Sequence, residues 1–523
     1  MNSKCLALIL VICLLISCCG CGLTINITPE TQSTTPTTPS NPTDPTNPTD
    51  PTDPSDPSDP TAPIDPPEEK PAGEETALTI NGHNVSHFQL NYFYVDAIDE
   101  FCNEYGSWIS YVLSTTTPLS DQIYDDEVGT TWADYFLKTA MGNAKNAYAL
   151  YDAAIAAGHT LTEDEQALIE TLRERIDEYA KHYEFKDADE YLKVIYGEYS
   201  NFESYMIYYE LLVTISSYFS AYAEGLLNSY TEPMLREYEA DRTYEYNSYS
   251  YATYYLSPSY FTDDSFTAED AAKQLASGDN NTIEKLNAAI AALEKKLDDS
   301  KTTFSTATVH TETLYNSIDI QLQEWIRDPS RQIGDIAYLT YTSEGGYFAP
   351  AEEGYYVILF TGVHDNQFPL ANVRHILAIF DGSTEEDMNK AKEEAEKIYA
   401  EWLAGEQTEE SFAELAKKYT DDRNGDVGGL YEDVYPGQMV QTFNDWCFDP
   451  SRAPGDHGIV ETEYGYHIMF YSGDSDTTFR DFMVSGDKQY EEVNAWQTAL
   501  IEAAIMETVD TSSVNMAYII DSN

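Results

Sequence analysis

The chain has 523 residues and a formal net charge of -63, with 91 acidic side chains against 28 basic ones. This charge excludes a general role in binding nucleic acid, because the phosphates would be repelled. The length exceeds what one hydrophobic core supports, so about two to four domains are expected. Of the seven cysteines, five lie in the first 21 residues, which excludes a disulfide framework. Cys102 and Cys447 are expected to be buried thiols, although a bridge between them stays open.

The N-terminal segment has the pattern of an export signal. Lys4 precedes an apolar run, Leu6–Ile16, that is too short to span a bilayer permanently. The run ends in Leu15-Ile16-Ser17-Cys18, which resembles a bacterial lipobox, where the signal is removed before the cysteine and the thiol receives a diacylglyceryl group. The resemblance implies a lipoprotein signal peptide over residues 1–17 and a stable anchor at Cys18, since two acyl chains hold a protein on a membrane. A plain secretory signal with unrelated cysteines is the alternative.

Residues 18–74 are predicted to be a disordered linker rich in Pro, Thr and Asp. From Pro36 to Pro66 a proline recurs at every third position, which matches the three residues per turn of a polyproline II helix. The segment has too little apolar material for a core. We expect a semi-rigid acidic stalk, with docking into an aromatic groove of a partner as the alternative.

Residues 75–245 are predicted to form a helical module. A short strand in Ala77–Ile80 and an Asn81-Gly82 turn precede Ser86, which is expected to cap a helix over Phe88–Tyr105. Further helical patterns cover Thr131–Ala157, Thr162–Tyr183, Ala188–Ile195 and Asn201–Leu227.

This layout resembles the N-terminal chaperone module of SurA/PrsA-type foldases, in which the last helix of the chain joins the module. Val493–Met506, within residues 475–523, has the helical spacing expected of that helix. The Tyr- and Leu-rich faces of the module are either ordinary core or a cradle for unfolded chains.

Two related segments follow, predicted as domains over residues 246–366 and 370–474. Glu324–Arg331 (EWIRDPSR) parallels Asp445–Arg452 (DWCFDPSR), and Gly354–Ile358 (GYYVI) parallels Gly465–Met469 (GYHIM). At the front of the segments, Thr253-Tyr254-Tyr255-Leu256 is matched to Arg374-His375-Ile376-Leu377. On this matching, Tyr254 stands in the place of His375 and Tyr356 in the place of His467.

The second segment resembles the parvulin family of peptidyl-prolyl isomerases. One histidine lies in each terminal strand, Val373–Ile379 and Gly465–Phe470, and between them lie two helices and a glycine-rich turn. The resemblance implies a multidomain α+β protein, with a helical SurA-like chaperone module and two parvulin-like domains, each an antiparallel four-stranded sheet with helices. Tyrosines do not titrate near neutral pH as histidines do, so the first domain is predicted to be degenerate and inactive as an isomerase.

The resemblance also implies the site residues. His375 and His467 match the paired histidines of the family, and Asp422 matches a position that holds either cysteine or aspartate. An aspartate there favours electrostatic tuning of the twisted peptide bond over covalent chemistry. The positions matched to substrate-binding residues are Val427, Gln438, Met439, Phe443 and Tyr464.

No cofactor and no metal are expected for this chemistry. Amide resonance opposes rotation by ~18–20 kcal/mol, so an isomerase only has to stabilise the twisted amide. Asp422-x-Asn424-x-Asp426, with Asp433 at the twelfth place, has some features of a calcium loop. Val427, however, stands where an EF-hand needs glycine.

The leading functional hypothesis is a lipid-anchored, extracytoplasmic isomerase and chaperone that assists the folding of secreted or surface proteins containing X-Pro bonds. A non-catalytic holdase, which would use both parvulin-like segments for binding, is the first alternative. A surface binding protein that uses its Tyr-rich body (42 tyrosines) is the second.

Overall fold

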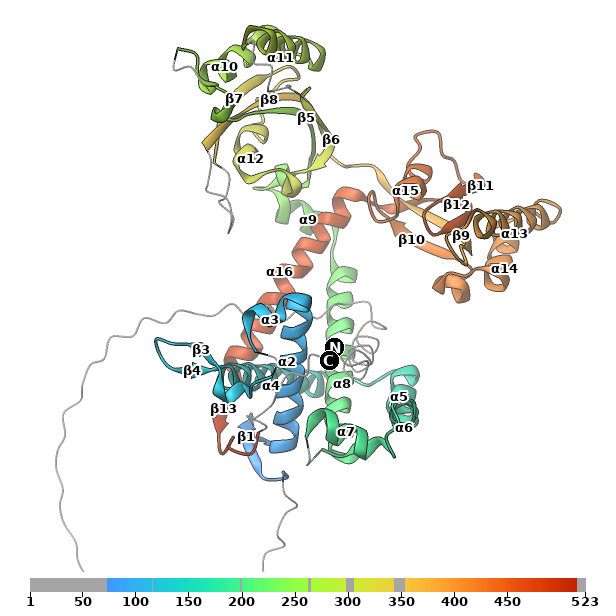
Figure 1. The fold of residues 1–523 in the computed structure, drawn as a ribbon. Coiled ribbons are helices and arrows are strands. Elements are labelled where there is room, and N and C mark those ends of the chain that lie inside the picture. Colours follow the sequence, from blue (N-terminus) through green and yellow to red (C-terminus); the bar gives the residue numbers. More distant parts are fainter. Residues whose placement is uncertain are drawn as a thin grey trace, which may run out of the picture. The chain divides into compact units, whose positions relative to one another are not determined.

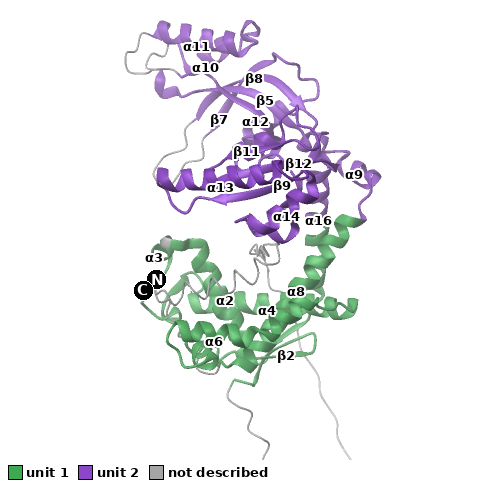
Figure 2. Cartoon of the chain, turned by 90° about the vertical axis from the view of Figure 1, so that its right-hand side faces the viewer, with its two compact units in different colours: residues 1–228, 491–523 green, residues 229–490 purple. Residues whose placement is uncertain are grey.

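The computed structural model describes residues 73–114, 116–197, 200–261, 265–297, 305–342 and 353–514. The predicted signal peptide, the lipidation site at Cys18 and nearly all of the proline-rich linker lie outside the described residues. The chain divides into two compact units, residues 1–228 with 491–523 (unit 1) and residues 229–490 (unit 2) (Figure 2). Within the described ranges, no helix combines the length and the apolar character needed to cross a membrane.

Unit 1 is mostly helical, with a three-stranded sheet of order β13-β1-β2 and a small hairpin of β3 and β4. Its main elements are β1 (Thr76–Ile80), β2 (His83–Ser86), α2 (His87–Tyr105), α3 (Ile109–Val112), β3 (Ile123–Asp125), β4 (Thr130–Thr131), α4 (Trp132–Ala157), α5 (Glu163–Glu170), α6 (Leu172–His182), α7 (Ala188–Tyr196), α8 (Phe202–Ser229) and β13 (Met506–Thr508).

The helix starts of unit 1 follow their capping residues. The side chains of Ser86, Thr131 and Thr162 each accept a hydrogen bond from the backbone N–H three residues on. In each capping box the backbone N–H of the capping residue donates in return to the side chain of that later residue. The helix expected over Thr162–Tyr183 is broken into α5 and α6 at Thr171, whose hydroxyl donates to the carbonyl of Ala167. Such side-chain bonds to the preceding turn compete with the regular helix.

Tyrosines on α2, α7 and α8 build much of the core of unit 1. The ring of Tyr92 lies 4.9 Å from Tyr196, 5.4 Å from Tyr205 and 5.3 Å from Tyr208, measured between centroids. The hydroxyls of Tyr196 and Tyr208 donate to the carboxylate of Asp96. Burial raises the pKa of Asp96 to about 6. Most of the tyrosines on the α8 face are therefore core residues.

The C-terminal part of α16 (Phe479–Ala503) completes unit 1. The indole of Trp496 stacks on Tyr222 with ring centroids 4.0 Å apart, and Leu500 packs against the same core. After the helix, Met506 in β13 pairs with Ile80 in β1. Residues from both ends of the described chain thus share one sheet.

Unit 2 contains two sheets built to the same plan, here called the first copy and the second copy. Their strand orders are β6-β5-β8-β7 and β10-β9-β12-β11, and all neighbouring strands are antiparallel (Figure 1). This mixed architecture confirms the predicted α+β class with two four-stranded sheets.

The first copy follows α9 (Glu232–Glu239) and consists of β5 (Ser248–Leu256), α10 (Ala268–Leu275), α11 (Ile283–Leu297), β6 (Thr308–Leu314), α12 (Ile320–Ile326), β7 (Ile336–Thr342) and β8 (Glu353–His364). The second copy consists of β9 (Pro369–Ile379), α13 (Glu385–Leu403), α14 (Glu409–Tyr419), the 3-10 turn η7 (Arg423–Val427), β10 (Leu430–Val434), α15 (Gln441–Cys447), β11 (His457–Glu461) and β12 (Gly465–Thr478).

The repeated Asp-Pro-Ser-Arg motif has the same geometry in both copies. The guanidinium of Arg331 lies 4.0 Å over the ring of Trp325, and that of Arg452 lies 3.9 Å over Trp446. In each motif the serine hydroxyl donates to the aspartate two residues before it, at 2.7 and 2.6 Å. The sequence parallel is therefore also a structural one.

The sheet register corrects one part of the predicted matching. In the second copy His375 lies opposite Met469. The residue of the first copy that corresponds to Met469 is Ile358, and Ile358 lies opposite Thr253. Thr253, and not Tyr254, therefore occupies the position of His375.

Burial of the neighbouring side chains agrees with this correction. Tyr254 packs with Ala252 and Leu256 against the α10–α11 side of the sheet. Tyr356 packs on the opposite, α12 side, where His467 has its place in the second copy. The expectation for Tyr254 was wrong because successive strand residues face opposite sides, so an error of one residue moves a side chain to the other face.

Candidate active site

Two histidines from neighbouring strands meet at the centre of the second copy. His375 on β9 and His467 on β12 are 2% and 6% exposed. Their Nδ1 atoms lie 3.0 Å apart, and the rings are nearly parallel at 17°. The predicted pairing of the two histidines is therefore present.

Asp422 joins this pair from the loop after α14. Its Oδ2 lies 2.8 Å from Nε2 of His375, and its Oδ1 accepts from the backbone N–H of Arg423 at 2.7 Å. The loop is tied to β9, because the hydroxyl of Thr420 accepts from the N–H of Leu377 at 3.1 Å. The three predicted catalytic residues thus form one connected cluster.

Thr462 extends the cluster on the far side of His467. Its hydroxyl is buried and lies 3.0 Å from Nε2 of His467. A neutral His467 donates through one ring nitrogen and accepts through the other, so it links Thr462 to His375, and Nε2 of His375 lies against the carboxylate of Asp422. The carboxylate stands at the end of this row of contacts.

The electrostatics of the cluster favour a neutral His467 and an ionised Asp422. Burial, reinforced by the neighbouring His375, lowers the pKa of His467 to about 4. The hydrogen bond from His375 holds the pKa of Asp422 well below its usual range, against the opposing effect of burial. At neutral pH His467 is therefore uncharged and Asp422 is ionised.

These shifts predict that acid weakens the second copy. The pKa of His467 in the folded state lies below its ordinary value of 6.5, so the unfolded chain binds more protons between these values. The contribution of His467 to the free energy of unfolding is full above about pH 6.5 and lost as the pH falls toward about 4, a loss of about 2–3 kcal/mol. Hydrogen exchange of the β9 and β12 amides across this range measures it.

His467→Asn serves as the comparison, because asparagine does not titrate. This variant should lose less protection between pH 6.5 and pH 4 than the wild type, even where its protection at neutral pH is lower. An equal loss in both proteins would contradict the assignment of the neutral state to His467.

An apolar wall stands beside the histidines. Phe443 on α15 is 1% exposed, and its ring meets His375 edge to face at 5.5 Å and His467 at 5.4 Å. Met439 packs in the same apolar group as Phe443. Both were expected from the sequence at the proline-binding position.

The other three predicted substrate-binding residues lie at the surface. Val427 is 59% exposed and Tyr464 is 57% exposed. Gln438 is exposed, and its side-chain oxygen accepts from the N–H of Tyr435 at 3.1 Å. Their roles in substrate binding stay predictions.

Tyr431 and Thr462 were missed by the sequence analysis. The hydroxyl of Tyr431 on β10 donates to Oδ2 of Asp422 at 2.9 Å. Neither residue has a spacing that reveals it, because both contacts arise only when the strands pair. The one signal in the sequence was that Thr462 lies two residues before Tyr464, which was predicted to bind substrate.

Gly429 lets the loop after Asp422 approach the strand of His375. Its carbonyl accepts from the N–H of His375 at 2.9 Å, and its φ is +70°. A Cβ at this residue would lie 2.2 Å from the carbonyl oxygen of His375, so only glycine fits here. Arg374 holds the same loop through the carbonyls of Val427 and Gly428, at 2.9 and 3.0 Å.

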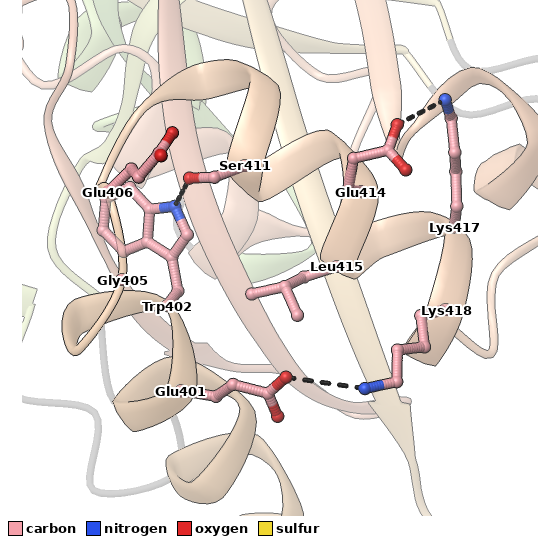
Figure 3. A pocket seen from close by; sticks show the side chains of 9 residues that line it. All are labelled: Glu401, Trp402, Gly405, Glu406, Ser411, Glu414, Leu415, Lys417 and Lys418. Atoms are coloured by element: carbon pink, nitrogen blue, oxygen red, sulfur yellow. Dashed lines mark hydrogen bonds and ion pairs between the residues drawn. The ribbon is translucent and has the colours of Figure 1, made fainter.

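A cavity of about 670 Å³ in the second copy is separate from this cluster. It lies between α13 and α14 and is lined by Trp402 and Leu415 together with charged side chains (Figure 3). Lys417 pairs with Glu414 and Lys418 with Glu401 around it. Neither histidine nor Asp422 lines it.

No metal centre competes with this assignment within the described part of the chain. There, no group of three or more His, Cys, Asp or Glu side chains is arranged to hold a metal ion.

Cys447 is a buried free thiol, so no bridge to Cys102 is formed.

The corresponding place in the first copy has a different set of side chains. Thr253 and Tyr356 stand at the two histidine positions. Thr253 bonds through its hydroxyl to Nε2 of His310 at 3.0 Å, and His310 stacks on Tyr251. The first copy therefore lacks the histidine pair.

Comparisons with known proteins locate the family resemblance in the second copy. The family model described as Rotamase, a PPIC-type PPIASE domain, matches residues 375–472. Foldase protein PrsA 1 of Listeria innocua is 32% identical over 102 residues, and Foldase protein PrsA 2 of Listeria monocytogenes is 34% identical over 102 residues. Each match covers 19% of this chain and 30% of the relative.

Solved PrsA structures are also similar. PrsA from Bacillus anthracis is 23% identical and covers 27% of this chain and 59% of its own, with a TM-score of 0.18. PrsA from Bacillus subtilis is 14% identical. The match covers 76% of this chain and 98% of the PrsA chain, with a TM-score of 0.25. Residues 375–472 thus match the model of a PPIC-type peptidyl-prolyl isomerase domain, and a segment of 102 residues in this chain is similar to the PrsA foldases of Listeria.

Proposed function

We propose that this protein is an extracytoplasmic peptidyl-prolyl cis-trans isomerase that carries its own chaperone module and assists the folding of secreted or surface proteins. The observation that carries the proposal is the connected cluster of His375, His467 and Asp422 beside the apolar wall of Phe443 and Met439. The sequence of the N-terminus supports attachment to the bacterial membrane through a lipid on Cys18.

The chemistry that this cluster supports is non-covalent. The apolar wall takes the prolyl ring, and the two buried histidines form a floor that excludes water. A planar amide has more negative charge on its carbonyl oxygen than a twisted one. The fixed charge of Asp422 destabilises the planar form relative to the twisted form, which lowers the rotational barrier.

The test is an exchange measurement on the full chain. Uncatalysed X-Pro isomerisation takes tens of seconds or more, so catalysis is readily seen by NMR exchange spectroscopy with a short proline-containing peptide. We expect acceleration in proportion to the concentration of the protein. No acceleration above the uncatalysed rate would contradict the isomerase function and leave the non-catalytic holdase.

A chaperone function of unit 1 is supported by its exposed aromatic side chains. Trp108 is 67% exposed and Tyr111 is 80% exposed, although their ring centroids lie only 5.4 Å apart. Nearby in sequence, Ile123 and Val128 are 56% and 73% exposed. Exposed apolar side chains favour contact with unfolded chains.

Replacing Trp108 and Tyr111 together by serine should weaken chaperone action and leave isomerisation intact. An unfolded client protein should bind weakly at each exposed aromatic side chain. The measurement is therefore light scattering by an aggregating client protein during refolding, with each variant present at the same molar ratio to the client. Ile155→Ser on α4, where the isoleucine is 57% exposed, is the control. Equal suppression of aggregation by both variants would contradict a role for the aromatic pair.

A further inference from the structure

Tyr431 contacts two of the three catalytic residues, although no motif marks it. Its hydroxyl donates to Oδ2 of Asp422 at 2.9 Å, and its ring lies 5.2 Å from the ring of His375, tilted by 31°. The residue is half-buried and packs with the apolar cluster that includes Phe443 and Val373. It therefore touches the carboxylate, the histidine and the apolar wall at once.

The hydrogen bond of Tyr431 decides how Asp422 faces the histidine. Oδ2 accepts the hydrogen bond of the Tyr431 phenol and lies beside Nε2 of His375. Oδ1 accepts the hydrogen bond of the backbone N–H of Arg423. With the phenol bonded to Oδ2, the carboxylate has a fixed rotation about its χ2 angle, a torsion that is otherwise broad. Bonds between a neutral donor and a carboxylate are also among the stronger hydrogen bonds.

The first copy offers an internal comparison at this position. Tyr431 lies opposite Val373 in the β9–β10 ladder, and His310 lies opposite Tyr251 in the β5–β6 ladder. His310 bonds to Thr253, the residue at the place of His375. The same ladder position thus contacts the central strand residue in both copies, and in the second copy it also bonds to the carboxylate.

We propose that Tyr431 is a positioning residue for isomerisation, which acts through Asp422 by fixing the orientation of its carboxylate toward His375 and which closes the apolar wall with its ring. This inference rests on the proposed isomerase function. It separates two roles in one side chain, since the hydroxyl serves the carboxylate and the ring serves the bound proline.

The phenol should also keep Asp422 ionised. A donor bonded to the charged form of a carboxylate favours that form, and the bond from Tyr431 is among the causes that lower the pKa of Asp422. Burial and the neighbouring carboxylate raise the pKa of Tyr431 to about 12, so the phenol stays a donor at every pH at which the protein works.

Two substitutions separate the two roles in the full chain. Tyr431→Phe removes the hydroxyl and keeps the ring, so kcat for a short X-Pro peptide should fall about 5-fold while KM changes less than about 2-fold. Tyr431→Leu removes both, so KM should also rise. In Tyr431→Phe, carbon-detected NMR titration of the Asp422 carboxyl should show an apparent pKa raised relative to the wild type.

Tyr471→Phe is the matched control. The hydroxyl of Tyr471 donates to Oδ1 of Asp474 at 2.6 Å on the same sheet, so this variant removes a bond of the same kind away from the histidines. It should leave kcat, KM and the titration of Asp422 unchanged.

The outcomes distinguish this inference from the function on which it rests. An active wild type together with unchanged kcat and unchanged Asp422 titration in Tyr431→Phe would overturn the role of Tyr431 alone. The same fall in kcat in Tyr471→Phe as in Tyr431→Phe would also overturn it. A wild type without catalysis would overturn the proposed function and this inference with it.

Discussion

Asp422→Asn should lower kcat/KM for X-Pro isomerisation about 100-fold, because a preorganised charge next to the reacting bond is lost. Three donors converge on this carboxylate: Nε2 of His375, the phenol of Tyr431 and the N–H of Arg423. An amide in the same place offers one oxygen, so at least one of these donors would face an NH2 group. The measurement is the exchange rate of a proline-containing peptide with the full chain at neutral pH.

Asp421→Asn is the control for this change. The neighbouring carboxylate is exposed, and its Oδ2 accepts from the N–H of Ile379 at 3.0 Å, a bond that an amide oxygen also accepts. Its substitution should change kcat/KM less than about 2-fold. A similar loss in both variants, or none in Asp422→Asn, would contradict the electrostatic role assigned to Asp422.

Arg480→Met should destabilise the base of the first copy by about 3 kcal/mol, the lower end of the cost of breaking a buried pair, because the buried carboxylate of Glu239 keeps an ion pair with Arg236. Arg480 and Glu239 are 5% and 4% exposed, and two guanidinium nitrogens lie 2.7 and 2.6 Å from Oε2 of Glu239. The same guanidinium donates to the side chain of Asn247 at 3.0 Å and to the carbonyl of Asp365 at 3.1 Å. One side chain at the start of α16 therefore holds both chain ends of the first copy.

Hydrogen exchange of the amides at the start of β5 and the end of β8 measures this effect locally, which is needed because a chain of several domains does not unfold in one step. Adding Glu239→Gln to Arg480→Met should restore part of the lost protection, since it removes a buried charge whose remaining cationic partner is the partly exposed Arg236. Lys273→Met, which breaks an exposed pair with Glu269, should change protection by less than about 1 kcal/mol. Equal effects of Arg480→Met and Lys273→Met would contradict the importance of the buried pair.

The sequence predicted the three residues of the cluster because they lie within recognisable local patterns. His375 and His467 each lie in a short apolar strand, and Asp422 follows a helix with clear ends. Strand pairing then brings residues together that are 92 positions apart. Phe443 in α15 and Met439, which lies just before that helix, follow from the same matching.

Contacts that depend on sheet register could not be predicted in the same way. Several alignments of the Tyr-rich strand β5 with β9 differ by one residue and look equally good. They place different side chains on the face of the sheet that packs against α12. The matching of Tyr254 to His375 was wrong for this reason. Tyr431 was missed because its partners come from β9 and from the loop after α14, which the sequence does not bring together.

The most direct test of the account compares the two copies in the full chain. In one variant His375 and His467 are both replaced by alanine, and in the other Thr253 and Tyr356 are replaced in the same way. The first variant should fall to the uncatalysed rate of X-Pro isomerisation, whereas the second should keep the activity of the wild type. Retained catalysis in the first variant, or its loss in the second, would contradict the assignment of the chemistry to the second copy.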